Sequence, residues 1–211
     1  MRIATYRYQD QRHVGQVSAD GQTVTAFDVP ADVAQHGALR LIETLMAGGT
    51  LPALTRQTVA VADVKLEAPI PLPRRNIWCV GRNYHEHAKE LSTSVFKDSN
   101  TNTQAWPIVF TKVPECVVGP FDDVVLPGAA VSDQIDYESE LAVIIGHGGK
   151  NIAAADAMKH IYGYTIVNDV TARDVQMRHQ QWDMGKSFDT FCPMGPWLVT
   201  ADEVDGRNTR V

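Results

Sequence analysis

The sequence lacks the long apolar runs, paired cysteines and basic clusters that characterise several large classes of protein. No window is apolar over the length needed to cross a bilayer, and the N-terminus has no apolar signal segment. The three cysteines, Cys79, Cys116 and Cys192, form no C-x-x-C pair, which argues against a disulfide scaffold and a structural zinc site. We therefore expect a cytoplasmic protein.

Charge narrows the range of partners further. The formal net charge of −6 comes without any long basic run, so neither nucleic acid nor an anionic membrane is expected as a partner. The apolar share of 44% is ordinary for a folded chain, and 211 residues can bury a substantial core. A bound divalent cation would neutralise part of the acidic excess locally.

Acidic residues alternate along one predicted strand and are the first candidates for chemistry. Residues 136–146 begin with Asp136, Glu138 and Glu140 at every second position and end in an apolar run. In a strand these side chains share one face, with the Cα atoms of Glu138 and Glu140 about 6.6 Å apart. Two carboxylates at that separation can meet on one small hard cation. A solvated strand face is the simpler alternative.

A third acid follows a second predicted strand. Residues 163–167 have little polarity, and Asp169 then falls between apolar residues, where an unpaired carboxylate is costly. Thr171, with Asp174 three residues later, has the spacing of a helix N-cap, so a helix should begin shortly after Asp169. Glu138, Glu140 and Asp169 together offer three oxygen donors for Mg²⁺ or Mn²⁺. The alternative for Asp169 is an ordinary turn residue with satisfied hydrogen bonds.

A histidine and a glutamate form a candidate proton-transfer pair. Asn83 and Glu86 have capping-box spacing, so a helix should begin there and place His87 and Glu90 on one face. A carboxylate beside an imidazole raises its basicity, as required of a base that activates water. A surface pair without function is the alternative. The polar segment 92–105 that follows is either a lid or a surface loop.

Lys186 is a candidate for binding a substrate carboxylate. Gly185-Lys186-Ser187 resembles the end of a phosphate-binding loop, but Gln180 stands where that motif requires glycine, so we reject that interpretation. A lysine between an aromatic-rich turn and a strand can instead reach a carboxylate as a point charge. An ordinary exposed lysine is the alternative.

Three prolines in five positions, Pro69, Pro71 and Pro73, interrupt any helix or central strand and predict a domain boundary. We expect a small α/β domain over 1–68 and a second domain over 69–211. Periodicity and turn signals predict strands over 2–8, 13–18, 22–29, 76–81, 136–146 and 163–167, short strands within 107–127, and helices over 41–46, 53–64 and 154–160.

Four motifs together resemble one known family. The runs VGRNYHEHAKE, DYESELAVIIG, GYTIVNDVTARDVQ and GKSFDTFCPMGPWLVTADE are similar, in order and separation, to the fumarylacetoacetate hydrolase family, and most of all to its acylpyruvase and oxaloacetate decarboxylase branch. The resemblance covers residues 69–204. It implies an α+β, mostly β fold, with a rolled mixed sheet or partly open barrel behind a small N-terminal α/β domain. It also implies a homodimer.

The resemblance also implies roles for particular residues. Glu138, Glu140 and Asp169 match ligands of Mg²⁺ or Mn²⁺. His87 and Glu90 match a water-activating pair on a lid helix. Arg173, Gln176 and Lys186 match residues that contact the substrate, and Lys186 also matches a group that stabilises negative charge during catalysis.

The function implied is a metal-dependent hydrolase that cleaves a C–C bond in acylpyruvate or other diketo-acid substrates by way of an enolate. An oxaloacetate-type decarboxylase, a sugar-acid lyase or isomerase, and a truncated inactive member are the alternatives. Family members continue beyond Val211 and contain a Thr-Gly-Thr-Pro turn that this sequence does not have. The sequence is therefore expected to be C-terminally shortened, either as a fragment or naturally.

Overall fold

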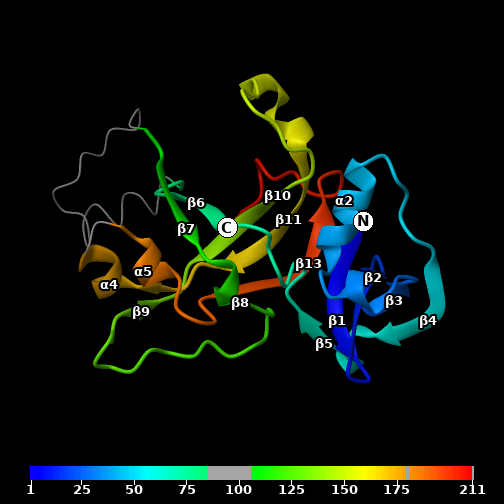
Figure 1. Cartoon of the computed structure of the whole chain (residues 1–211), viewed down its shortest axis with the longest axis horizontal. Helices are drawn as coiled ribbons and strands as arrows, with labels where there is room; N and C mark the ends of the chain where they lie inside the picture. Colours follow the sequence, from blue (N-terminus) through cyan, green and yellow to red (C-terminus); the bar gives the residue numbers. More distant parts are fainter. Residues whose placement is uncertain (85–105, 179–180, 211) are drawn as a thin grey trace.

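A computed structural model describes residues 1–84, 106–178 and 181–210 (Figure 1). The predicted His87–Glu90 pair and the polar segment 92–105 lie outside these residues. The main sheet runs in the order β10-β11-β13-β1-β2-β3-β4, with β5 also paired to β1 and β8 to β13. The β8–β13 pair is parallel, so this sheet is mixed, and in the described chain it does not close into a barrel. The predicted mostly β fold is confirmed.

The strands are β1 (Arg2–Tyr8), β2 (Gln11–Val17), β3 (Thr23–Phe27), β4 (Leu54–Ala60), β5 (Lys65–Glu67), β6 (Ile77–Gly81), β7 (Ile108–Lys112), β8 (Val117–Val118), β9 (Ile135–Asp136), β10 (Ser139–Ile145), β11 (Ile161–Asn168), β12 (Thr171–Ala172) and β13 (Cys192–Thr200). The helices are α1 (Ala31–Ala34), α2 (Ala38–Met46), α4 (Arg173–Arg178) and α5 (Asp183–Lys186), with 3₁₀ turns η1 (Val61–Asp63), η2 (Pro114–Cys116) and η3 (Ala154–His160). No helix among the described residues is long and apolar enough to span a membrane.

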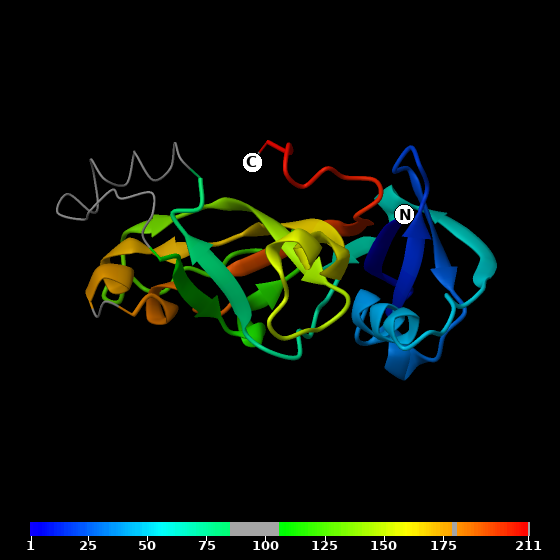
Figure 2. The same cartoon turned by 90° about the horizontal axis from the view of Figure 1, so that it is seen from above.

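Strand β1 links the two ends of the chain. It pairs with β2 through a tight turn in which Gln9 and Asp10 both have positive φ, the geometry that suits a two-residue hairpin. It also pairs with β13, where Arg2 lies opposite Val199. Strands from both sides of the proline-rich segment therefore join one sheet, as Figures 1 and 2 show. The division at residue 68 stays a prediction.

Two hydrophobic clusters support the sheet. One contains Ile3, Leu41, Phe191 and Leu198, and it joins α2 to the C-terminal half of the chain. The other lies on the opposite face of β1 and includes Tyr6. Ile3 packs in one cluster and Ala4 and Tyr6 in the other, so both faces of β1 are buried, and the strand predicted over residues 2–8 is confirmed.

One predicted helix is wrong. Residues 53–64 form β4 and the short turn η1, with Thr25 and Thr58 opposite each other in the ladder to β3. The two threonine hydroxyls are 2.8 Å apart, and such β-branched pairs favour a strand. The helix predicted over 154–160 is present, but as the 3₁₀ turn η3.

A separate two-stranded ladder, β6 with β7, covers the region beside β10 and α5 (Figure 1). Residues alternate in direction along it, so Phe110 and Lys112 of β7 are both buried, whereas Val109, just before Phe110, and its cross-strand partner Val80 are exposed. The buried face of this ladder contributes one wall of the candidate site.

Candidate active site

The pairing of β10 with β11 brings the predicted acids together. The strands are antiparallel, and Ser139 at the start of β10 lies opposite Asn168 at the end of β11. The Asp169 amide donates to the Glu138 carbonyl at 2.8 Å, and the Asn168 side chain accepts from the Glu138 amide at 3.0 Å. This register places Glu138, Glu140 and Asp169 around one cavity of about 20 Å³.

Asp136 does not continue the row of acids. Strand β9 ends at Asp136 and β10 begins at Ser139, so the uninterrupted strand predicted over 136–146 is broken at Tyr137 and Glu138. Tyr137 points into solvent, 80% exposed. Glu138 and Glu140 line the cavity, whereas Asp136 binds an arginine at its edge.

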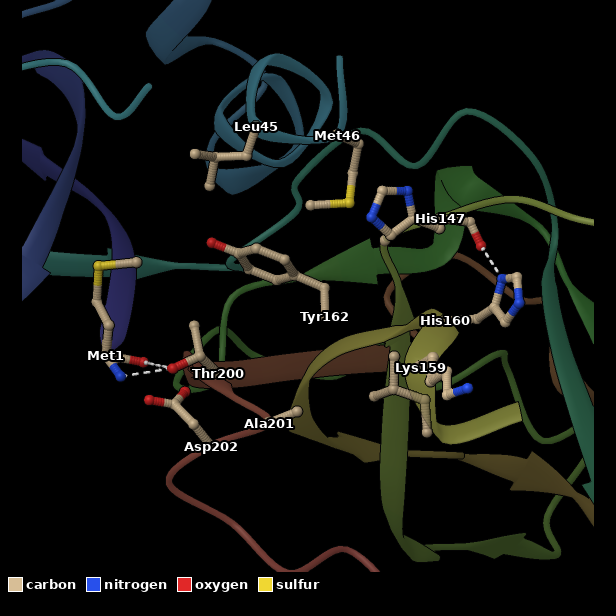
Figure 3. Close-up of a pocket in the computed structure, with 12 residues that line it drawn as sticks. Met1, Leu45, Met46, His147, Lys159, His160, Tyr162, Thr200, Ala201 and Asp202 are labelled. Atoms are coloured by element: carbon tan, nitrogen blue, oxygen red, sulfur yellow. Dashed lines mark hydrogen bonds between the residues drawn. The ribbon is translucent and has the colours of Figure 1, made fainter. Parts of the chain in front are cut away.

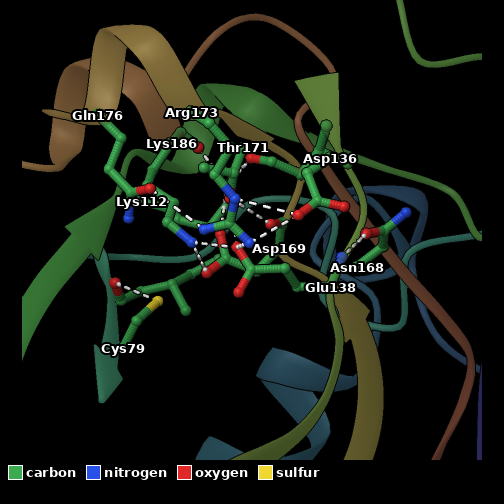
Figure 4. Close-up of polar contacts among 12 residues, drawn as sticks. Cys79, Lys112, Asp136, Glu138, Asn168, Asp169, Thr171, Arg173, Gln176 and Lys186 are labelled. Atoms are coloured by element: carbon green, nitrogen blue, oxygen red, sulfur yellow. Dashed lines mark hydrogen bonds and ion pairs between the residues drawn. The ribbon is translucent and has the colours of Figure 1, made fainter. Parts of the chain in front are cut away.

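Lys186 joins two of the acids. Its Nζ lies 2.6 Å from Glu138 Oε1 and 2.7 Å from Asp169 Oδ2, and the side chain is 2% exposed (Figure 4). The ammonium also lies 4.8 Å from the centre of the Phe110 ring, a cation–π contact. The alternative of an exposed lysine is therefore wrong: Lys186 is a buried cation in the centre of the site.

The short helices α4 and α5 hold Lys186 in place through a close approach at Gly185. A Cβ atom there would lie 2.6 Å from the Gln176 amide nitrogen and 2.8 Å from the Ala172 carbonyl oxygen. Any other side chain would push the two helices apart. The glycine before Lys186 therefore serves packing, and the resemblance to a phosphate-binding loop is coincidental.

Helix α4 supplies an arginine and a glutamine. The Arg173 guanidinium donates to Asp136 Oδ2 at 2.8 and 3.0 Å, lies 3.2 Å from Glu138 Oε1, and donates to Gln176 Oε1 at 3.1 Å. Gln176 is buried and lines the same cavity. The structure therefore brings together all the predicted metal-binding and substrate-binding residues that it describes.

The predicted N-cap at Thr171 is wrong. Thr171 belongs to the two-residue strand β12, and α4 begins at Arg173. The Thr171 hydroxyl lies 2.5 Å from Glu138 Oε1 and 2.9 Å from the Asp169 carbonyl oxygen. It thus serves the acidic cluster rather than the helix end.

Lys112 is a member of the cluster that sequence reasoning missed. Its Nζ lies 2.9 Å from Asp169 Oδ1, and the side chain is fully buried. A signal was present: Phe110 and Lys112 occupy alternate positions of one strand, so burial of the phenylalanine face implies burial of the lysine. A buried ammonium requires a counter-charge, which the sequence alone did not locate.

Burial and charge set the protonation of the two glutamates in opposite directions. Burial raises the pKa of Glu140 to about 7, and the nearby charges of Asp169 and Glu138 add to the rise, against a hydrogen bond from Tyr84. Burial acts in the same direction on Glu138, but Lys186, Thr171 and Arg173 outweigh it and hold the pKa of Glu138 below its usual value. Tyr84 is a second residue of the site that was not predicted.

The donor set suits a hard divalent ion. Three carboxylates face one small cavity, no ion pair reaches Glu140 among the described residues, and Asp169 Oδ1 receives no aligned hydrogen bond there despite its contact with Lys112. In their present positions, however, no three acidic, histidine or cysteine side chains of the described chain form a closed metal-binding group. The chemistry of these carboxylate donors therefore suits Mg²⁺ or Mn²⁺. The Lys186 ammonium bridges two of them, Glu138 and Asp169.

A larger cavity of about 490 Å³ lies away from these residues, between α2 and the ends of β11 and β13 (Figure 3). Its lining includes Tyr162, whose buried hydroxyl has no hydrogen-bond partner among the described residues. Lys159 and His160 at its rim are engaged by Asp156 and by the His147 carbonyl. Polar groups do not converge there as they do around Lys186, so we take the smaller cavity as the candidate active site.

Comparison with known proteins identifies the family. The family model described as fumarylacetoacetate (FAA) hydrolase C-terminal matches residues 76–211, well over half of the chain. The chain belongs to the fumarylacetoacetate hydrolase family. The resemblance recognised from the four sequence motifs is confirmed.

Relatives within the fumarylacetoacetate hydrolase family differ in their named activities. Oxaloacetate tautomerase YisK of Bacillus subtilis (strain 168) is 51% identical over 140 residues, which cover 66% of this chain and 44% of that protein. The solved fumarylacetoacetate hydrolase of Exiguobacterium antarcticum has a TM-score of 0.73 and 35% identity, covering 97% of this chain and 68% of its own. Maleylpyruvate hydrolase from Sphingobium sp. SYK-6, solved with manganese(II) and pyruvate, has a TM-score of 0.68 and 26% identity, covering 97% and 69%.

The chain spans about half the length of the curated relatives it matches, from 42% to 54% among the most similar. Family membership is therefore shown for the fumarylacetoacetate hydrolase domain itself, and the activity of the whole protein is a matter for proposal.

Proposed function

We propose that this chain carries the active site of an enzyme that interconverts the keto and enol forms of a small 2-oxo dicarboxylic acid of the oxaloacetate class. The observation that carries the proposal is the cavity in which Arg173, Gln176 and Lys186 face three carboxylates. One set of groups suits an anionic substrate and the other suits a divalent cation. The named activity of a relative that is 51% identical supports the choice of reaction.

Mg²⁺ or Mn²⁺ would be held by Glu138, Glu140 and Asp169. When bound, the ion would act as a Lewis acid toward the 2-oxo group and favour its enolate form. The chain's own groups bind and orient the substrate. Arg173 offers a planar guanidinium to a carboxylate, and Gln176 offers an amide donor beside it.

Lys186 would stabilise the negative charge that develops on the substrate. Its ammonium is buried, so a hydrogen bond from it to the 2-oxo oxygen is stronger than the same contact in water. Phe110 covers one side of the ammonium and limits access by water. Proton transfer at C3 requires a base, and we assign this role to His87 supported by Glu90, both outside the described residues.

Hydrolysis of a C–C bond in an acylpyruvate, by way of the enolate, is the second candidate. The likeness to maleylpyruvate hydrolase, solved with manganese(II) and pyruvate, favours it. The same site would bind the 2-oxo acid end of the substrate, and His87 would then take a proton from water rather than from carbon. The two reactions therefore differ in what the base activates.

The experiment follows the enol form of oxaloacetate with Mg²⁺ and with EDTA, together with release of CO₂ and cleavage of acylpyruvate. Metal-dependent loss of enol without CO₂ or pyruvate supports the tautomerase, and cleavage of acylpyruvate that disappears in His87→Ala supports the hydrolase. Asp169→Asn should abolish either activity. Asp122→Asn removes a surface acid paired with Lys65 and is the matched control. Activity retained in Asp169→Asn would refute both proposals.

We also propose that the chain acts as a homodimer. On the outer face of β6 and β7 the side chains of Trp78, Val80 and Val109 are 72%, 49% and 49% exposed, and Val80 lies opposite Val109 in the ladder. A contiguous apolar patch of this kind is typical of a protein interface. Sedimentation velocity should show a dimer that Trp78→Glu converts to monomer, and a monomeric wild-type protein would refute the idea.

A further inference from the structure

The ammonium of Lys112 is fully enclosed by acceptors from two other segments. Nζ donates to the Val170 carbonyl at 3.2 Å and to the Lys186 carbonyl, and it forms an ion pair with Asp169 Oδ1 at 2.9 Å. Of the three N–H donors of the ammonium, two are thus used by main-chain carbonyls, and the Asp169 carboxylate supplies the counter-charge at ion-pair distance. Lys112 thereby ties β7 to the segment after β11 and to the end of α5.

These contacts form a closed ring with the functional residues. Asp169 contacts Lys112 through Oδ1 and Lys186 Nζ through Oδ2, at 2.9 and 2.7 Å. The main-chain carbonyl of Lys186 returns to Lys112 (Figure 4). Lys112 therefore contacts both the Asp169 carboxylate and the main chain from which the Lys186 side chain extends.

Lys112 does not contact the substrate cavity itself. The lining of that cavity includes Asp169 and Lys186 but not Lys112, which is 0% exposed. It therefore acts through its neighbours rather than on a reacting atom. Its position differs in this respect from that of Lys186, whose ammonium faces the cavity.

We propose that Lys112 is a positioning residue, which holds Asp169 in the orientation required to bind a divalent cation and sets the place from which Lys186 reaches the substrate. The inference rests on the proposed function in taking Asp169 as a ligand of that cation. Neither the motifs of the sequence nor the pattern of acidic residues assigns Lys112 this role.

The test measures the affinity for Mn²⁺, from the electron paramagnetic resonance signal of the free ion, in Lys112→Met and the wild-type protein. Methionine keeps much of the volume and apolar length of lysine but removes the ammonium. Loss of such a supporting group should weaken Mn²⁺ binding by roughly 10- to 100-fold. Lys65→Met removes a surface lysine paired with Asp122 at 2.7 Å and should leave Mn²⁺ affinity unchanged.

A second variant covers the case in which Lys112→Met fails to fold with an unpaired carboxylate inside. The double variant Lys112→Met/Asp169→Asn carries no buried charge at this pair. If Lys112 acts through Asp169, the double variant binds Mn²⁺ as weakly as Asp169→Asn alone. Further weakening in the double variant would show that Lys112 acts by another route and would overturn the proposal.

The outcomes separate this inference from the proposed function. Weaker binding in both Asp169→Asn and Lys112→Met supports both ideas. Unchanged or tighter binding in folded Lys112→Met, with weaker binding in Asp169→Asn, overturns only the role of Lys112, because a merely structural lysine would lower thermal stability and leave affinity intact. Unchanged binding in Asp169→Asn would overturn the ligand assignment and the role of Lys112 with it.

Discussion

Two clusters in this molecule each combine acidic and basic side chains, but they differ in how completely the acids are paired with cations. Near the N-terminus, Glu67 of β5 accepts from Arg7 at 3.2 Å and from Arg12 at 2.5 Å, and so links β1, β2 and β5. Around Asp169, by contrast, the cations are deeply buried, and the acid Glu140 is reached by no ion pair among the described residues.

The difference indicates what each cluster does. In the N-terminal cluster both carboxylate oxygens of Glu67 are occupied by arginine, and no acid is left without a cation. In the site, burial raises the pKa of Glu140 to about 7, the carboxylates of Asp169 and Glu138 add to the rise, and no described cation pairs with Glu140. A balanced cluster stabilises a fold, whereas a buried and unbalanced one is suited to binding a further cation.

The largest expected effect that tests this contrast is on Lys186→Met. The variant removes the buried ammonium proposed to stabilise developing charge, so kcat should fall by about 10²- to 10³-fold in steady-state assays. Lys159→Met, which removes an exposed lysine paired with Asp156 at 2.6 Å, is the control and should keep full activity. A loss of less than tenfold in Lys186→Met would mean that its charge is not used in the reaction.

Glu140→Gln should next separate the two clusters through pH and metal. The folded-state pKa of about 7 lies above the ordinary value of 4.5, so the folded protein binds the extra proton. The stability that this proton on Glu140 contributes is fully present below pH 4.5 and is lost as pH rises through 7. In EDTA, thermal unfolding of the wild-type protein should therefore show this loss, and the Glu140→Gln variant should not.

Binding of Mg²⁺ should restore the stability that the wild-type protein loses at higher pH. At a Mg²⁺ concentration 100 times its dissociation constant, binding adds about 2.7 kcal/mol to wild-type stability. Glu140→Gln should lose most of that increment because one anionic ligand is gone. Equal stabilisation of both proteins by Mg²⁺ would show that Glu140 does not face the ion.

Glu67→Gln tests the balanced cluster. Removing this carboxylate charge takes away the counter-ion of Arg12, which is 15% exposed and then keeps only its contacts with Gln35, and should lower the free energy of unfolding by about 1–3 kcal/mol in urea denaturation. The kcat of the folded protein should not change. A loss of activity without a loss of stability would mean that the N-terminal cluster contributes to the site.

The sequence located the acids of the site more successfully than their partners. Alternation found Glu138 and Glu140, and the apolar surroundings of Asp169 found the third acid, because these signals are local. Lys112 and Tyr84 were missed because their roles depend on how β7 and the segment after β6 pack against strands far away in sequence. The break between Asp136 and Ser139 was missed for the same reason.

Local sequence patterns also gave wrong predictions where strand pairing in the sheet determined the secondary structure. Residues 53–64 were compatible with a helix by spacing, but pairing of β4 with β3 made most of them a strand. The ladder between β10 and β11 set which residues met in space, and a one-residue shift would have turned Glu140 away from Asp169. The identity of the acids could thus be predicted from the chain, whereas their counter-ions required the fold.

The smallest effect is expected at a third pair, which has the same chemistry as Lys112 and Asp169 but lies at the surface. Lys65 Nζ is 2.7 Å from Asp122 Oδ1, and the lysine side chain is 63% exposed. Solvent screens such a pair, so Lys65→Met should change the free energy of unfolding by less than about 1 kcal/mol. Chemical denaturation of Lys65→Met and Lys112→Met side by side measures how much burial alone adds to a lysine–aspartate contact. If the two losses were equal, the enclosure of Lys112 would have no energetic consequence, and the contrast between the clusters would fail at its buried end.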